Sequence, residues 1–149
     1  FEVRTAGEED IAAVSEEKEG PVCYGLVRRA REPLRLTAKP AVAEAMRQAA
    51  PDRDPAWRAL DTAVLHELVL KKLLGLTDEQ AGPHEAVGYT KDVAEVFAQV
   101  NQGAYDLGFV LRPSRVEQVQ EVAESGERMP QKSTYFSPKL LSGLVMRRL

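Results

Sequence analysis

The sequence predicts an α+β fold, with a mixed and mainly antiparallel sheet packed against helices. Two observations support this prediction: the opening residues alternate apolar and polar side chains with the period of a strand, and later segments space apolar side chains as on one face of a helix. A strand, a helix and a strand in succession in the second half would also suit a βαβ unit. With 149 residues, the chain is expected to form a single domain over residues 1–149.

The first twenty residues predict a strand followed by a short helix. Residues 1–5 alternate Phe, Val and Thr with Glu and Arg, as in a half-buried strand. An acidic stretch follows over residues 8–19, in which Ile11 and Val14 are spaced as on one face of an exposed helix. Gly20, with the proline that follows it, would end that helix.

Two further strands and a helix are predicted next. The strands cover residues 22–28 and 34–38, with a connection of hairpin length at residues 31–33. Together with the first strand they predict a three-stranded antiparallel opening to the sheet. A helix is expected over residues 41–50, which are rich in good helix formers and follow a proline.

The longest helix is predicted to begin at Asp54-Pro55 and to end before Gly75. Aspartate caps the free amides at a helix start, and proline occupies the first turn without losing a hydrogen bond. Glycine suits the left-handed residue that closes a helix. Apolar residues recur between these points at steps of three to five, at Leu60, Val64, Leu65, Leu68, Val69 and Leu73.

Shorter elements are predicted between residues 77 and 103. Thr77 and Gln80 form a capping box, and residues 87–89 are expected to be a brief strand. Thr90 is expected to cap a helix with valines and a phenylalanine on one face, which Gly103 ends.

The strongest alternation in the chain runs over residues 105–111 and predicts a strand that Pro113 stops. Ser114 with Glu117 then forms a second capping box, for a helix that ends before Gly126.

The composition excludes several classes of protein. The net charge of −3 provides no general attraction to phosphate backbones, so nucleic-acid binding is not expected. No apolar run approaches the roughly 20 residues that span a bilayer, so no membrane partner is expected. A single cysteine, Cys23, cannot pair within the chain, which fits a cytoplasmic compartment. Because the chain starts at Phe1 without methionine, it is interpreted as the C-terminal fragment of a longer protein, whose missing N-terminal region would be a partner.

The sequence contains no complete signature of a metal site, a phosphate loop or a serine nucleophile, and it identifies no cofactor. His66 is followed by glutamate, as in the zinc pattern His-Glu-x-x-His, but position 70 is leucine and His84 is distant, so no metal is predicted. Asp61 and His66 are secondary candidates, because Asp61 on the same predicted helix could help to position the imidazole. A structural histidine is the more frequent role at such a position.

The closing segment gathers cations and hydroxyl groups that could hold a phosphate or a carboxylate. The candidate ligand-binding residues are Arg112, Gln131, Lys132, Ser133, Thr134 and Lys139. Arg112 would join the others if its strand is a neighbour. Spacing alone favours the alternative that this segment is an edge strand. Its lysines would then be solvated and would only prevent the strand from pairing with strands of other chains. No catalytic residue is assigned.

A longer pattern in the same region resembles a known family. Residues 129–145, Met-Pro-Gln-Lys-Ser-Thr-Tyr-Phe-Ser-Pro-Lys-Leu-Leu-Ser-Gly-Leu-Val, resemble the C-terminal part of a bacterial and archaeal family named domain of unknown function 1015. Residues 60–66 and 109–113 also resemble it, and Ser137 departs from its pattern, which has an aromatic residue there. The resemblance implies an uncharacterised cytoplasmic protein roughly three times as long.

Three functions are left open. The first is binding of a small anionic metabolite or phosphate group. The second is implied by the resemblance, which would make this chain part of a small-molecule kinase. Members of the family are often encoded beside serine-biosynthesis enzymes. Their N-terminal region has been likened to a ParB-type fold that in some proteins phosphorylates free serine. The third is a non-catalytic interaction module, in which the acidic stretch or a sheet edge contacts the rest of the protein or forms a homodimer.

Overall fold

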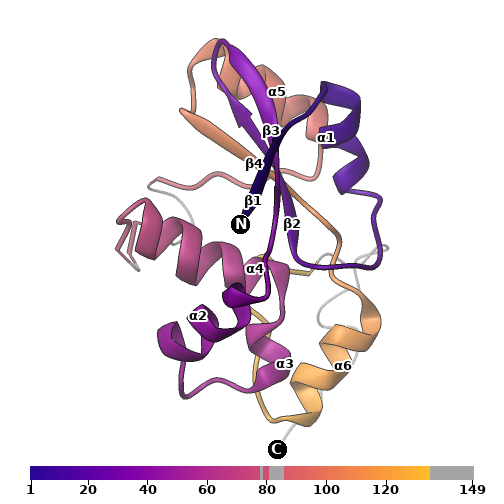
Figure 1. Cartoon of the computed structure of the whole chain (residues 1–149), viewed down its shortest axis with the longest axis vertical. Helices are drawn as coiled ribbons and strands as arrows, with labels where there is room; N and C mark the ends of the chain where they lie inside the picture. Colours follow the sequence, from indigo (N-terminus) through magenta and orange to yellow (C-terminus); the bar gives the residue numbers. More distant parts are fainter. Residues whose placement is uncertain (78, 81–85, 135–149) are drawn as a thin grey trace, which may run out of the picture.

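The computed structural model describes residues 1–77, 79–80 and 86–134, which form an α+β fold (Figure 1). Its strands form one sheet in the order β1-β3-β2-β4, and every neighbouring pair is antiparallel. The strands are β1 Glu2–Thr5, β2 Cys23–Arg28, β3 Arg31–Thr37 and β4 Leu107–Leu111. The predicted fold class and its antiparallel opening are therefore confirmed, and within this opening β1 pairs with β3.

Helices lie on both faces of this sheet. Two of them, α1 (Glu8–Val14) and α5 (Val93–Gln102), pack on one face. The others share a core with the opposite face, and Figure 1 shows them extending beyond the end of the sheet. They are α2 Ala41–Ala49, α3 Pro55–Arg58, α4 Asp61–Val64, the π-helix η1 Leu65–Leu73 and α6 Val116–Glu124. Within the described part of the chain, each helix is too short or too polar to cross a lipid bilayer.

The alternation of β2 explains why the chain has two clusters of buried residues. Cys23 and Val27 point into the cluster beneath α1 and α5, whereas Tyr24 points into the cluster that the other helices share. Tyr24 is fully buried and meets Phe109 of β4 edge to face, with ring centroids 6.4 Å apart. The sheet is therefore buried on both faces along its central strand.

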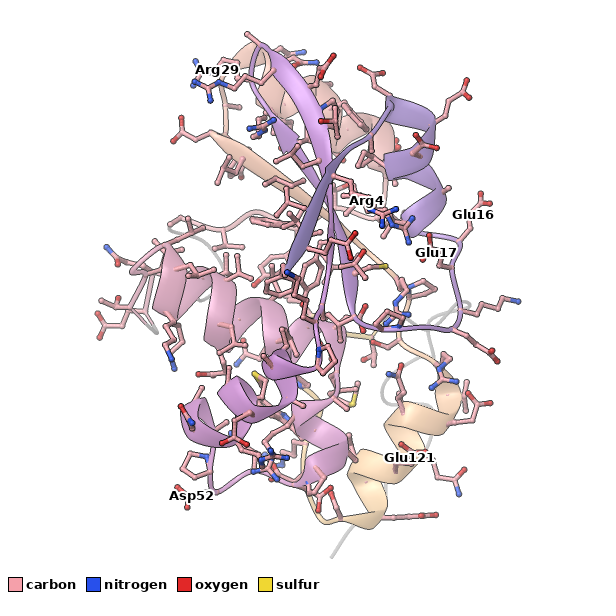
Figure 2. The ribbon with its side chains drawn as sticks, viewed as in Figure 1. Arg4, Glu16, Glu17, Arg29, Asp52 and Glu121 are labelled. Carbon is pink, nitrogen blue, oxygen red and sulfur yellow. The ribbon has the colours of Figure 1, made fainter. Side chains whose placement is uncertain are left out.

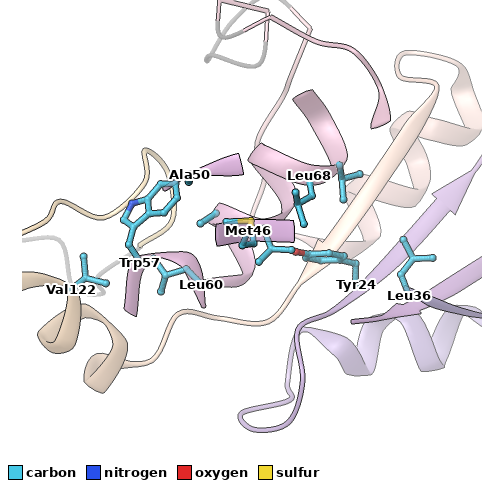
Figure 3. Packing of buried hydrophobic residues seen from close by; sticks show 11 residues of the cluster. Tyr24, Leu36, Met46, Ala50, Trp57, Leu60, Leu68 and Val122 are labelled. Atoms are coloured by element: carbon cyan, nitrogen blue, oxygen red, sulfur yellow. The ribbon is translucent and has the colours of Figure 1, made fainter. Parts of the chain in front are cut away.

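The larger cluster connects the helices to one another as well as to the sheet. Figure 3 shows Trp57 of α3 close to Leu60 and Val122, so that α6 packs against α3. Arg53 stacks over the Trp57 ring at 4.8 Å and forms an ion pair with Glu127 at 2.6 Å. These contacts attach the segment that follows α6 to the start of α3.

The sequence predicts one long helix after Asp54, and this prediction is wrong. Asp54 does cap α3, because its carboxylate accepts a hydrogen bond from a first-turn amide at 2.8 Å. The chain then leaves the helix at Leu60, whose ψ of 134° is extended, and a second helix begins at Asp61. From Leu65 onward the helix continues with π geometry. Leu60 is buried at this break, so tertiary packing outweighs the helical periodicity of the apolar residues.

The βαβ unit suggested for the second half does not form among the described residues. Residues 87–89 are not a strand of the sheet, and β4 joins β2 in antiparallel orientation. The cap of α5 is Asp92 rather than Thr90, and α6 is capped one residue later than predicted, at Arg115. Aspartate and threonine are both favoured helix caps, so the sequence did not separate Asp92 from Thr90. Serine is the more favoured cap at the start of α6, but the Ser114 hydroxyl donates to the Ser133 carbonyl instead.

Several local predictions are confirmed. The helix predicted over residues 41–50 is α2. Thr77 and Gln80 exchange the two hydrogen bonds of a capping box at 3.0 and 3.2 Å. The glycines predicted to close helices, Gly75, Gly103 and Gly126, have φ angles of 73°, 82° and 79°. The hairpin turn lies earlier than expected, with Ala30 at a φ of 52°, so β3 starts at Arg31 rather than at residue 34.

Gly25 allows α1 to lie close to the sheet. A Cβ at this position would lie 2.5 Å from Ile11 Cγ2 and 3.2 Å from Val110 Cβ, which is closer than side chains pack. Ile11 and Val14 are fully buried at this contact, so the prediction of an exposed helix holds only for the acidic side of α1. The close approach of α1 depends on the missing side chain.

We expect Gly25→Ala to lower the free energy of unfolding by about 1–3 kcal/mol, because the new methyl group overfills the contact. Urea unfolding followed by circular dichroism measures this loss. Ile11→Leu moves a methyl group off Cβ and so relieves the contact with position 25. The double variant Gly25→Ala with Ile11→Leu is therefore expected to lose less free energy of unfolding than the sum of the two single losses. Strictly additive losses would contradict a direct clash between Ile11 and the methyl group added at position 25.

Candidate functional site

Asp61 and Arg112 form a buried bidentate ion pair, although they lie 51 positions apart in the sequence. Arg112 Nε donates to Asp61 Oδ2 and Nη2 donates to Oδ1, each at 2.8 Å. The Arg112 side chain is 10% exposed and the Asp61 side chain is 9% exposed. The remaining nitrogen, Nη1, donates to the carbonyl of Gly20 at 3.0 Å. The structure thus joins two residues that the sequence selected for separate reasons.

Three elements position this ion pair. Asp61 is the first residue of α4, where free amides favour a negative charge. Its backbone carbonyl accepts a hydrogen bond from the Tyr24 hydroxyl of β2 at 2.7 Å. Arg112 directly follows β4, and the hydrogen-bonded Asp61 carboxylate raises the pKa of Arg112. The guanidinium is therefore charged and fixed in orientation.

A cavity of about 260 Å³ opens beside the ion pair. It lies where the segment before β2, the end of β4 and the start of α6 meet. Its charged lining residues are Lys18, Glu19, Asp61, Arg112 and Arg115. The sequence did not select Lys18 or Arg115, because they lie far apart along the chain and neither belongs to a motif.

The free charges around this cavity are mostly positive. Lys18 and Arg115 are exposed, and neither has an ion-pair partner within the described residues. Since Asp61 and Arg112 neutralise each other, the rest of the described lining has two cations, Lys18 and Arg115, against the single carboxylate of Glu19. Gln118 adds an amide group, whose oxygen already accepts from the Arg115 backbone at 3.0 Å. The cavity therefore offers an anion both charge and hydrogen-bond donors.

A second hollow has the opposite electrostatic character. It measures about 390 Å³, is more open, and lies between the end of β1 and the start of α1. Its charged lining residues within the described part of the chain are Glu8, Asp10 and Glu32, all of them acidic. Among the described residues, no group of three His, Cys, Asp or Glu side chains is arranged to hold a metal ion. This hollow does not suit an anion.

The described part of the predicted ligand-binding loop is attached beside the first cavity. Ser114 Oγ donates to the Ser133 carbonyl at 2.7 Å, which ties residues 130–134 to the cavity wall. Ser133 is 9% exposed, and its hydroxyl donates to the Pro130 carbonyl at 2.6 Å. Lys132 has a φ of 60°, a left-handed conformation that residues with side chains rarely adopt. The Ser133 hydroxyl therefore holds a strained turn together.

The other predicted loop residues have different environments. Gln131 and Lys132 are exposed, and Thr134 is half-buried. Lys139 lies outside the described residues, as does His84. The meeting of Lys132 and Lys139 with Arg112 thus stays a prediction.

A second polar cluster lies on the α1 face of the sheet, between Glu17, Arg35 and Cys23. Arg35 donates two hydrogen bonds to the Glu17 carboxylate, at 2.6 and 2.9 Å, and the Cys23 thiol donates to it at 3.3 Å. Hydrogen bonds from Arg35 hold the pKa of Glu17 below its usual value. Burial, with the neighbouring carboxylate, raises the pKa of Cys23 to about 11. A thiol held in its protonated form is a structural donor rather than a nucleophile.

His66 has a structural environment. Its Nδ1 lies 3.3 Å from Glu67 Oε1, and Glu67 also forms an ion pair with Lys71 at 3.0 Å. Both pairs lie within η1, in which His66 and Glu67 are half-buried. Of the secondary candidates, Asp61 therefore joins the candidate site, whereas His66 has a partner on its own helix.

Comparisons of the chain with protein-family models, curated proteins and solved structures find no match. The resemblance of residues 129–145 to a family of unknown function stays a prediction.

We expect Asp61→Asn to destabilise the fold by about 3–5 kcal/mol, because it leaves the Arg112 charge buried without its partner. The double variant Asp61→Asn with Arg112→Met removes both charges and is expected to be more stable than Asp61→Asn alone. Urea unfolding of the wild type, both single variants and the double variant measures the coupling. A double variant that loses the sum of both single losses would show that the charges act independently.

Glu17→Gln is expected to destabilise the chain at neutral pH and to have little effect in acid. The lowered pKa of Glu17 contributes stability that is present above its unfolded value of 4.5 and is lost as the pH falls through the folded value. Urea unfolding at neutral pH and below pH about 4 measures the change. Glu16→Gln is the control, because Figure 2 shows Glu16 pointing away from the sheet. A pH-independent difference between wild type and Glu17→Gln would contradict this assignment.

Proposed function

We propose that this chain binds a small anionic metabolite or a phosphate group in the cavity beside the Asp61–Arg112 pair. One observation carries the proposal: Lys18 and Arg115 line the same concave site, and neither has an ion-pair partner among the described residues. In a chain with a net charge of −3, such a local excess of positive charge is not a consequence of overall composition.

The residues that line the cavity would contribute to binding in different ways. Lys18 and Arg115 would supply the charge that attracts and holds the anion, since their charges are not neutralised by another described group. Arg112, whose charge is shared with Asp61, would act mainly by holding the wall of the cavity in place. The Gln118 amide nitrogen would add a neutral hydrogen bond. This proposal gives Arg112 a positioning role instead of the direct ligand contact expected from the sequence.

The size and charge of the cavity limit which kinds of ligand can bind there. At about 260 Å³ it lies slightly below the range of roughly 300–1,000 Å³ that is typical of sites for drug-sized ligands. A phosphate group or a short carboxylic acid would fit such a volume. Glu19 on the same wall disfavours a highly charged anion and favours a ligand with a cationic or donor group beside its anionic end.

The kinase alternative needs a second site, for a nucleotide. The sequence contains no phosphate-loop signature for a nucleotide, so we propose binding and not phosphoryl transfer. The segment that contains Lys132 and Ser133 is attached to the proposed site, within the described part of the chain, by the Ser114–Ser133 hydrogen bond.

We expect Arg115→Ala to weaken binding of inorganic phosphate or O-phosphoserine roughly tenfold, because it removes a charge-assisted contact. A titration monitored by NMR chemical shifts measures the dissociation constant, and added salt is expected to weaken binding further. Arg128→Ala is the matched control, because Arg128 is exposed and does not line the cavity. Equal binding by the two variants, or no shift near the cavity in the wild type, would refute the proposal.

A further inference from the structure

Strand β1 forms an edge of the sheet with exposed side chains. It pairs with β3 on one side, and no described strand pairs with its other side. All of its residues, Glu2–Thr5, are exposed, and Val3 retains 55% of its surface. An edge strand with an exposed apolar residue is a template for pairing with another strand.

The register shows which backbone groups of β1 point outward. The Ala6 amide donates to the Pro33 carbonyl at 3.1 Å, one position beyond the pairing of Thr5 with Leu34. Because hydrogen bonding to one neighbour alternates along an antiparallel strand, Glu2 and Arg4 share the phase of Ala6 and bond toward β3. Val3 and Thr5 therefore present their N–H and C=O groups at the edge that faces away from β3, called the free edge here because no described strand pairs with it.

The side chains of β1 divide between the two faces of the sheet. Val3 is in register with Leu36, whose side chain belongs to the larger core cluster. Glu2 and Arg4 lie on the opposite face, where Arg4 Nε donates to Glu2 at 2.6 Å. Figure 2 shows Arg4 on the side of the sheet that α1 covers. An acid and a base thus flank Val3 in the sequence and share the face opposite its side chain, where both are solvent-exposed.

We infer that β1 pairs with β1 of a second copy of this chain, antiparallel and centred on Val3. In this register Val3 and Val3 of the second copy exchange both N–H···O hydrogen bonds, since these groups point to the free edge. Glu2 then lies opposite Arg4 of the second copy, and Arg4 lies opposite Glu2 of the second copy. These are non-hydrogen-bonded positions, where side chains of facing strands come closest.

Charge complementarity selects both the partner and the register. Centring the pair on Arg4 would place two arginines opposite each other, which is unfavourable. Centring it on Thr5 would place Arg4 opposite Ala6 and form no ion pair across the strands. The sequence Glu2-Val3-Arg4 is therefore self-complementary in the Val3-centred register, and the partner is a second copy.

This inference goes beyond the proposed function and does not depend on it. The cavity proposed to bind the anion is lined by residues of other segments, and none of them belongs to β1. Ligand binding and dimerisation can therefore be tested separately.

Sedimentation velocity of the full 149-residue chain over a range of concentrations tests the pairing. Arg4→Glu places Glu2 opposite a glutamate in both halves of the interface, and Glu2→Arg places two arginines together. Each is expected to weaken the dimer roughly tenfold or more. An equimolar mixture of the two variants restores opposite charges across the strands and is expected to form a heterodimer. The double variant Glu2→Arg with Arg4→Glu is expected to dimerise like the wild type.

Circular dichroism and urea unfolding confirm that each variant is folded, which is expected because Glu2 and Arg4 are exposed. A wild-type chain that stays monomeric at high concentration would overturn the inference. A dimer that Arg4→Glu and Glu2→Arg leave unchanged would also overturn it, because the interface would then lie elsewhere. The same holds if the mixture of the two variants forms no heterodimer.

Discussion

The buried ion pair between Asp61 and Arg112 connects the helical part of the chain to the end of the sheet. Moving two charges out of water is costly, so a pair of this kind adds less to stability than its short distances suggest. Its main effect is geometric. Asp61 begins α4 directly after the extended residue Leu60, and Arg112 directly follows β4, so the bidentate contact fixes the direction of both segments. Gly20 is attached to the same guanidinium, and the cavity forms among these segments.

The same geometry explains why the cavity has an excess of positive charge. Because Arg112 is neutralised by Asp61, the electrostatic character of the site depends on Lys18 and Arg115, which come from two other segments. Among the described residues, the turn that contains Lys132 is attached to this region by the hydrogen bond between Ser114 and Ser133. A site assembled from so many segments depends on the integrity of the whole fold, as is usual for ligand-binding cavities formed by loops on a rigid scaffold.

Central and edge strands of the sheet have different roles. Strand β2 is buried on both faces, and Gly25 allows α1 to approach it, so β2 contributes to stability. Strand β1 is exposed along its length, and its short acid–apolar–base sequence suits pairing with itself. The edge and the cavity do not share a residue, which leaves the two surfaces free to act independently.

The sequence by itself determined the α+β class, most element positions and the glycine helix ends, because hydrophobic period and backbone preference are local properties. It also selected Asp61 and Arg112. It did not identify the break at Leu60, since one extended residue leaves the apolar spacing almost unchanged, nor Lys18 and Arg115 as site residues. Only the tertiary structure decided these points, because an ion pair across 51 positions and a cavity between separate segments depend on how distant segments pack.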